Sequence, residues 1–316
     1  MTEQLAQAAR ELEALLDSGR VLLNEPLKDH TSFRIGGPAD VFVSPAGEEE
    51  LLSCLRLLAE RDVPFLLIGN GSNLLAPDSG CRCVVLQIGK QMGAVRREGN
   101  ELVCGAGALL SQIAAFAKEE GLAGLEFASG IPGTLGGACI MNAGAYGGEM
   151  KDVVTEVRVI TKDLLPELRT AADGLCFGYR TSSLMQEGAL VTGARIRLSE
   201  DSREAIAARM EELRRKRVEK QPLDVPSAGS TFKRPEGYFA GKLIMDAGLR
   251  GFRVGDAQVS EKHCGFVVNR GNATAADVTE LIRRVQETVE ERFGVRLEPE
   301  VRILTEEGSL WRNERR

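Results

Sequence analysis

The chain has 316 residues, enough for roughly two or three compact domains, so a single small module is excluded. Its apolar fraction of 43% and charged fraction of 27% are those of an ordinary globular protein. The net charge of −6 disfavours a general nucleic-acid binder, because neutralising phosphates needs a basic surface. The basic run Arg214–Arg217 is countered by Glu211, Glu212 and Glu219, so we expect it on a solvated helix face.

The seven cysteines are scattered, with no Cys-x-x-Cys and no matching histidine spacing, and this disfavours a metal site or a disulfide framework. The acidic start of the chain, with Glu3, Glu11 and Asp17, does not resemble a signal peptide. No run approaches the ~20 apolar residues that a membrane helix needs. We therefore expect a protein of the reducing cytoplasm.

The first third of the chain reads as a strand-helix-strand unit behind a peripheral helix. Leucines and alanines at helical spacing predict the peripheral helix over residues 2–18. A strand over residues 40–44, an amphipathic helix over 48–61 and a short buried strand over 65–68 follow. The last strand runs directly into Gly69, which begins a glycine loop.

The middle of the chain is expected to hold strands around one helix. Two β-rich runs alternate between residues 83 and 104, and a helix over 111–120 is stopped by Gly121. Strands near residues 153–161 and 189–197 come after a long glycine-rich stretch.

A charged helix is expected to link this part to a last domain. Ser202 is a plausible N-cap for it, and Pro222 ends it after Lys220. The last domain should contain a helix over residues 273–293 and a closing strand over 301–304, after which we expect the polar tail to fray.

The first glycine loop is Gly69-Asn70-Gly71-Ser72-Asn73. Its glycines permit positive φ, so successive backbone N–H groups can converge on a phosphate, which suits a pyrophosphate. It lacks the third glycine of the Rossmann fingerprint and the Gly-Lys-Ser/Thr of a P-loop. By itself such a loop is a tight turn about as often as a ligand cradle.

A second loop, Ser129–Gly137, continues with high glycine density to Gly148. Dense glycines let a flat or extended ligand lie against bare backbone, while Ser129, Thr134 and Asn142 offer hydrogen bonds to phosphates or a heteroaromatic edge. The alternative is a set of packed β-turns. We favour a ligand site, because turn clusters seldom extend over so many residues.

A serine hydroxyl lies beside two cations in Gly229–Pro235, where Ser230 precedes Lys233 and Arg234. No Gly-x-Ser-x-Gly elbow surrounds it, and the chain has only two histidines, so few bases could complete a triad. Ser230 is better interpreted as a proton donor than as an acyl nucleophile, with a plain turn serine as the alternative.

Taken in order along the chain, these motifs resemble those of the UDP-N-acetylenolpyruvoylglucosamine reductases, over about Asn24 to Thr305. The absence of a long tyrosine-bearing insertion before Asn269 resembles the shorter second type of that family. The matching segments are His30–Gly37, both glycine loops, Phe177–Arg180, Gly229–Pro235 and Leu297–Arg302.

The resemblance implies an α+β fold, in which a two-lobed FAD-binding domain of the vanillyl-alcohol-oxidase (PCMH) type precedes a C-terminal α/β substrate-binding domain. We place the N-terminal helix and first lobe at residues 1–95 and the second lobe at 96–202. The substrate-binding domain follows at 203–305 and the polar tail at 306–316.

The resemblance also implies the activity. It is the FAD-dependent, NADPH-consuming reduction of the enolpyruvyl ether of UDP-N-acetylglucosamine-enolpyruvate to UDP-N-acetylmuramate, for peptidoglycan. FAD would be bound non-covalently and NADPH would donate the hydride. The partner is then a small UDP-sugar, with no metal, nucleic acid, membrane or obligate protein partner. The alternatives are another flavin oxidoreductase of this fold, acting on an alcohol or sugar, and a non-catalytic UDP-sugar sensor.

Three residues match the family's catalytic positions. Ser230 would protonate the substrate carbon, and Arg180 would face the substrate carboxylate as charge builds in the enolate. Glu300 would steady the enolic oxygen, and we prefer it to Glu298, two residues earlier on the same strand face, because of motif register.

Substrate contacts are expected from Lys233, through a phosphate or carboxylate, and from Tyr238, which could stack on uracil or simply be a core aromatic. The cofactor contacts that the resemblance assigns come from the segment before the first loop and from both loops. They are Arg34, Gly69, Asn70, Gly71, Ser72, Asn73, Ser129, Gly130, Ile131, Pro132, Gly133, Thr134, Gly136, Gly137, Asn142 and Gly144.

Overall fold

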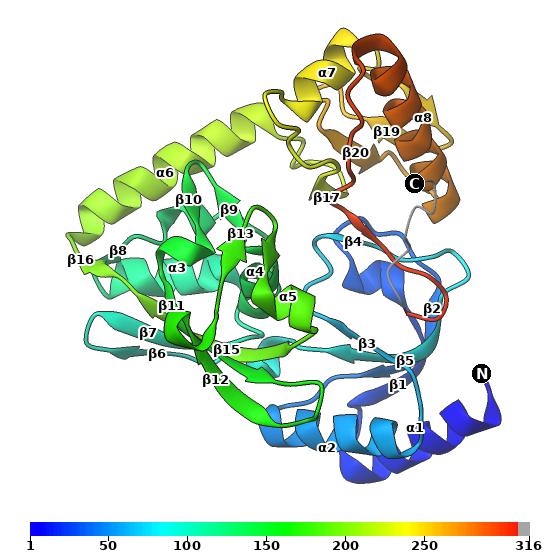
Figure 1. Cartoon of the computed structure of the whole chain (residues 1–316), viewed down its shortest axis with the longest axis vertical. Helices are drawn as coiled ribbons and strands as arrows, with labels where there is room; N and C mark the ends of the chain where they lie inside the picture. Colours follow the sequence, from blue (N-terminus) through cyan, green and yellow to red (C-terminus); the bar gives the residue numbers. More distant parts are fainter. Residues whose placement is uncertain (309–316) are drawn as a thin grey trace.

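The structure is a computed structural model that describes residues 1–308. Two lobes lie side by side, and a third body is joined to the second lobe by one long helix (Figure 1). Among the described residues, no helix combines the length and apolar character that a membrane crossing requires.

The first lobe is a mixed sheet with strand order β1-β2-β5-β3, in which only β1 runs antiparallel to its neighbour. Two amphipathic helices bury Leu12 and Leu55 against it, as the spacing of their leucines predicts. The elements are α1 (Glu3–Leu15), β1 (Val21–Pro26), β2 (Pro38–Val43), α2 (Glu48–Glu60), β3 (Phe65–Ile68), β4 (Leu74–Leu75) and β5 (Cys81–Gln87).

The second lobe is an antiparallel sheet with strand order β12-β11-β15-β7-β6. Short helices and hairpins cover it (Figure 1). Its elements are β6 (Val95–Glu98), β7 (Glu101–Gly105), α3 (Leu110–Glu119), β8 (Leu122–Ala123), α4 (Leu135–Met141), β9 (Gly144–Ala145), β10 (Gly148–Glu149), β11 (Val154–Ile160), β12 (Pro166–Thr170), β13 (Phe177–Gly178), β14 (Thr181–Ser182), α5 (Ser183–Glu187), β15 (Leu190–Arg197) and β16 (Ser199–Glu200).

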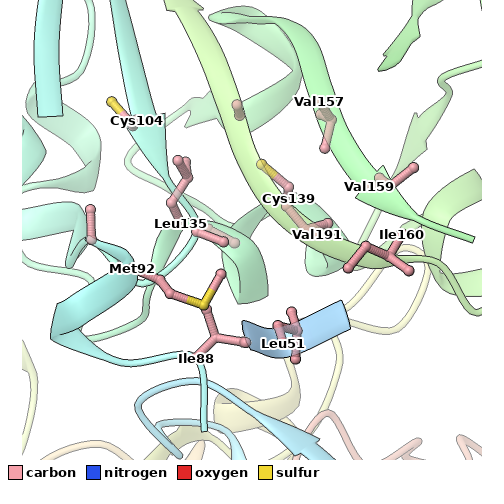
Figure 2. Close-up of a cluster of buried hydrophobic side chains, with 14 of the residues drawn as sticks. Leu51, Ile88, Met92, Cys104, Leu135, Cys139, Val157, Val159, Ile160 and Val191 are labelled. Carbon is pink, nitrogen blue, oxygen red and sulfur yellow. The ribbon is translucent and has the colours of Figure 1, made fainter. Parts of the chain in front are cut away.

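The two lobes share one hydrophobic core. Figure 2 shows Leu51 of α2 close to Ile88 and Met92, with Leu135 and Cys139 of the second lobe next to them. All five side chains are buried in the same cluster. The two lobes therefore have no separate cores. We keep the boundary between them, near residue 95, as a proposal.

The C-terminal body has its own core behind an antiparallel sheet with strand order β17-β20-β19-β18. α8 begins with a capping box of Thr274 and Asp277 and buries Val278, Leu281 and Val285 along one face. The elements are α6 (Arg203–Lys220), β17 (Ser227–Ser230), α7 (Ala240–Asp246), β18 (Arg253–Val254), β19 (Ala257–Val259), β20 (Phe266–Asn269), α8 (Ala275–Phe293) and β21 (Arg302–Ile303).

The linker helix α6 is capped as expected, since the Ser202 hydroxyl accepts the N–H of Ala205. Ile206 is its buried residue, so it gains little from packing. Intrahelical ion pairs, such as that of Arg214 with Glu211, lie on its solvated surface.

After the C-terminal body, the chain returns to the first lobe (Figure 1). β21 pairs in parallel with β4, directly after the first glycine loop. Glu306 is fixed as well, because its carbonyl accepts the N–H of Arg82 and its carboxylate accepts the hydroxyl of Ser79. The expectation that the tail frays directly after Thr305 is therefore wrong at Glu306, and residues 309–316 lie outside the described part.

The glycine-rich stretch is more regular than we expected. It contains helix α4 and the β9–β10 hairpin. A Cβ at Gly136 would lie 3.1 Å from the Cβ of Ala106, so the missing side chain lets α4 approach the sheet. Glycine has low helix propensity, and this hid α4 from a reading of the sequence.

Candidate active site

The two glycine loops lie against each other. The amide of Asn70 donates a 2.7 Å hydrogen bond to the carbonyl of Pro132. A Cβ on Gly69 would collide with the hydroxyl of Thr134. Segments some 60 residues apart in the sequence thus form one surface.

The first loop presents a row of unused backbone donors. Within the described part of the chain, the N–H groups of residues 69–73 donate to no protein acceptor. Gly71 has φ +59°, and a Cβ there would collide with the carbonyl of His30. A row of free N–H groups held in this conformation fits the oxygens of a diphosphate.

The predicted cofactor residues divide into open and packed positions. Asn70, Gly130, Pro132 and Gly137 are exposed, as is Arg34, which adopts a left-handed φ of 55°. The half-buried positions Gly69, Ser72, Asn73, Ser129, Ile131, Gly133 and Gly144 flank them, whereas Gly71, Thr134 and Gly136 are buried and shape the loops.

Asn142 is the predicted cofactor residue whose side chain is fully occupied within the protein. It is completely buried, with a left-handed φ of 45° at the end of α4. Its amide donates to Glu149 and to the carbonyl of Gly178, and its oxygen accepts the N–H of Lys151. A direct side-chain contact of Asn142 with a cofactor is therefore contradicted, and its role is to hold the loop.

Arg180 projects from the tip of a tight hairpin. β13 and β14 pair through Gly178 and Thr181, so Tyr179 and Arg180 form the two-residue turn. Arg180 has φ +55°, a conformation that costs a non-glycine residue about 1–2 kcal/mol. From this turn its Nε donates a 2.7 Å hydrogen bond to Oε1 of Glu300.

Glu300 is held by backbone bonds from two sides. Its N–H donates to the carbonyl of Thr231, and its carbonyl accepts the side-chain amide of Asn73 in the first glycine loop. The side chain is 14% exposed. Burial raises its pKa above the ordinary value, and the charge and hydrogen bond of Arg180, with the charge of Lys233, partly oppose this.

Glu298, the neighbouring candidate, faces a different environment. Its side chain is 69% exposed and its carboxylate pairs with Nζ of Lys233 at 2.5 Å. It lines a second hollow, whereas Glu300 lines the pocket of Ser230. The structure thus supports the choice of Glu300.

The three predicted catalytic residues, Ser230, Arg180 and Glu300, line one pocket of about 380 Å³. Ser230 ends β17, and its hydroxyl forms no hydrogen bond within residues 1–308. Sequence reasoning brought these residues together only through the family resemblance. Arg234, the cation that follows Lys233 in the same motif, lines the pocket too, together with cations that sequence reasoning missed, namely Lys242, Arg250 and Lys262.

The predicted substrate residues lie further out. Lys233 lines the second hollow beside Glu298 rather than the pocket of Ser230. Tyr238 is 48% exposed and borders neither hollow, so its interpretation as a core aromatic is wrong. Tyr179 borders both, and its hydroxyl accepts the N–H of Arg234.

His263 lines the pocket as well. Its Nδ1 accepts the N–H of Gly265, and burial lowers its pKa. This histidine is therefore hydrogen-bonded and is held towards its neutral form.

Comparisons with known proteins agree with this geometry. Residues 39–163 match the family model described as FAD binding domain. Residues 221–304 match the one described as UDP-N-acetylenolpyruvoylglucosamine reductase, C-terminal domain. The α+β fold, with an FAD-binding domain before a C-terminal domain, is thus confirmed.

Relatives span nearly the whole chain. The UDP-N-acetylenolpyruvoylglucosamine reductase of Agathobacter rectalis is 52% identical over 97% of this chain and 97% of its own. That of Caldanaerobacter subterraneus subsp. tengcongensis is 50% identical over 93% and 97%. The crystal structure of the Thermus caldophilus enzyme matches with a TM-score of 0.76 and 40% identity, over 90% of this chain and 97% of its own. The chain therefore belongs to the UDP-N-acetylenolpyruvoylglucosamine reductase family.

Proposed function

We propose that this protein reduces the enolpyruvyl ether of UDP-N-acetylglucosamine-enolpyruvate to UDP-N-acetylmuramate, using FAD and NADPH. The observation that carries the proposal is the meeting of Ser230, Arg180 and Glu300 in one pocket. These residues come from three separate segments, and the chemistry needs an acid, a carboxylate-binding cation and a group for the enolic oxygen in one place.

FAD would occupy the surface of the two glycine loops. The unused N–H groups of residues 69–73 and the exposed backbone at Gly130 and Gly137 suit its diphosphate and a flat ring. The chemistry that FAD supplies when bound is two-electron hydride transfer, which side chains cannot perform.

Arg180 and Glu300 would act as a pair on the substrate. The guanidinium can hold the substrate carboxylate as negative charge develops, and it keeps Glu300 oriented through the 2.7 Å hydrogen bond. The raised pKa of Glu300 favours its protonated form, which can donate a hydrogen bond to an enolic oxygen.

Ser230 would then give its hydroxyl proton to the substrate carbon. The hydroxyl has no competing hydrogen-bond partner within the described residues, and Ser230 lines the same pocket as Arg180 and Glu300. An ordinary serine is a weak acid, so the surrounding cations must stabilise the alkoxide that remains.

The excess of positive charge suits a UDP-sugar. Glu300 is the carboxylate lining the pocket, against the cations Arg180, Arg234, Arg250, Lys262 and Lys242, of which Lys242 is paired with Asp246. Such a set can neutralise a nucleoside diphosphate. We keep Lys233 and Tyr238 as outer substrate contacts, supported by the motif match alone.

The proposed role is peptidoglycan precursor synthesis, and with it cell-wall biogenesis, cell shape and division. We place the enzyme in the cytoplasm, which the free cysteines support, since thiols stay reduced there. We also propose that it works without nucleic acid, a membrane or an obligate protein partner.

The test is purification followed by a coupled assay. The protein should show flavin absorbance, and NADPH consumption should depend on the enolpyruvyl nucleotide. A colourless protein that does not rebind FAD would contradict the proposal. NADPH-independent oxidation of an alcohol or sugar would instead favour another flavin oxidoreductase, and ligand binding without turnover would favour a sensor.

A further inference from the structure

One arginine of the linker helix behaves unlike its neighbours. In the basic run Arg214–Arg217, Arg214 and Lys216 pair with glutamates on the exposed side of α6, and Arg215 lies 3.8 Å from Glu211. Arg217 instead turns inward and is half-buried. The expectation that the whole run covers a solvated face is therefore wrong at Arg217.

Arg217 lies on the second glycine loop. A Cβ at Gly130 would lie 2.9 Å from Cδ of Arg217 and 3.1 Å from its NH1. With glycine at this position, the arginine can lie directly against the backbone of the loop, whereas a Cβ would require the arginine side chain to shift. The contact joins a helix of the C-terminal half to an exposed loop position within the matched FAD-binding region.

The Arg217 guanidinium lacks an anionic partner. Within residues 1–308 its side chain makes no hydrogen bond and no ion pair. Burial lowers its pKa, an effect that the nearby Tyr146 only partly offsets. A desolvated guanidinium without a carboxylate is costly unless a ligand supplies the negative charge.

Neither glycine loop contains a lysine or arginine of its own. A dinucleotide diphosphate carries negative charge that backbone N–H groups only partly offset, and a guanidinium can hold two phosphate oxygens at once. We infer that Arg217 binds the diphosphate of FAD at the Gly130 turn, so that the linker helix takes part in holding the cofactor. This inference rests on the proposed function.

The position of α6 supports the inference. Its last turn is fixed to the C-terminal body, because Nζ of Lys262 donates to the carbonyl of Val218. Lys262 itself lines the pocket of Ser230. The Arg217 contact would therefore tie the cofactor to the body that carries the substrate pocket.

The test compares Arg217→Met with Arg215→Met, the same change on the same helix at an exposed position. FAD is titrated into the apoprotein, and binding is followed by flavin fluorescence. Loss of a charged hydrogen bond should weaken FAD binding about 10-fold to 100-fold in Arg217→Met. Arg215→Met should bind FAD like the wild type.

A second readout separates charge from packing. The dissociation constant for FAD should rise with added NaCl less steeply in Arg217→Met than in the wild type, because a screened attraction has been removed. Arg217→Lys keeps the charge, so it should keep the wild-type salt dependence with weaker binding. This variant also serves if Arg217→Met does not fold.

Unchanged FAD affinity in both Arg217 variants would overturn the inference. If their KM for NADPH or for the UDP-sugar rises instead, the phosphate that Arg217 binds belongs to that ligand, and the assignment to FAD is equally overturned. A wild-type protein that binds no FAD would contradict the proposed function itself, a result that the titration identifies first.

Discussion

The glycine loops and the Ser230 pocket recognise ligands in opposite ways. The loops offer backbone N–H groups from residues 69–73 and contain no cation. The pocket offers side chains, with Arg180, Glu300 and further cations around Ser230. Ligand binding by the loops therefore depends on glycines, whose lack of a side chain leaves the backbone N–H groups accessible. Ligand binding by the pocket depends on the functional groups of side chains.

Substitutions in the two regions should therefore have different effects on cofactor binding and on turnover. Adding a methyl group in the loops should abolish cofactor binding by a steric route. Removing one functional group in the pocket should leave the cofactor bound and slow the reaction. The two regions meet at Asn73, whose side chain holds the carbonyl of Glu300.

Ser230→Ala should give the largest loss of turnover. Removing a general acid typically costs about 10²-fold to 10⁴-fold, so kcat should fall within that range while FAD stays bound. Steady-state NADPH consumption with saturating substrate measures it. Ser227→Ala, on the same strand β17, is the control and should keep near wild-type kcat. A fall in kcat of less than tenfold in Ser230→Ala would remove Ser230 from its proposed role.

Gly71→Ala should prevent FAD retention. The new Cβ meets the carbonyl of His30 and the backbone has φ +59°, so the loop must shift. Gly99→Ala is the control, because it has φ +61° with open space around it and pays only the backbone strain, about 1–2 kcal/mol. The ratio of flavin to protein absorbance after purification is the readout. Equal flavin content in the two variants would show that the packing of Gly71 does not matter for FAD.

Glu300→Gln should reveal the raised pKa of Glu300. A carboxyl whose pKa is raised on folding stabilises the native state most at pH below its ordinary pKa of 4.5, and this stabilisation is lost as pH rises through the raised value. The free energy of unfolding of the wild type minus that of Glu300→Gln should therefore fall as pH rises above the ordinary pKa of 4.5. Urea titrations at a series of pH values measure the difference.

The exposed Glu298 provides the matched control. Glu298→Gln should change the free energy of unfolding by less than about 0.5 kcal/mol, because the residue is 69% exposed and its pair with Lys233 is solvated. A wild-type advantage over Glu300→Gln that grows with pH would contradict a raised pKa of Glu300.

Lys233→Met should have the smallest effect. Its side chain pairs with Glu298 outside the Ser230 pocket, so KM for the UDP-sugar should rise by less than about fivefold. Arg250→Met, which removes a cation inside the pocket, should raise KM more. The opposite order would place the substrate phosphates in the hollow of Lys233.

Much of the fold could be predicted where local pattern and tertiary packing agree. The α8 stripe is an example, since its apolar spacing matches its burial. The strand β3 was predicted at its bounds, but the expectation that it is buried is wrong, because only Ile68 is buried and Phe65 is exposed. Helix α4 could not be predicted, because its glycines signal a loop and become helical only by packing on Ala106.

The site shows the same limit. Ser230, Arg180 and Glu300 were identified by motif, and the structure places them together. Asn142 was misread, because an amide in a glycine loop looks free in sequence and only the fold shows that it is saturated. Arg217 was misread because its neighbours are solvated, and no local signal tells which member of a basic run turns inward.

The most direct measurement separates the two half-reactions under anaerobic conditions. In Ser230→Ala, NADPH should bleach the flavin absorbance at the wild-type rate, and recovery of absorbance after addition of the enolpyruvyl nucleotide should be slowed. In Gly71→Ala, no flavin should be present to bleach. Two results would contradict the account that the loops bind FAD while the pocket reduces the substrate. One is normal recovery of flavin absorbance in Ser230→Ala, and the other is slowed bleaching by NADPH with normal recovery in the same variant.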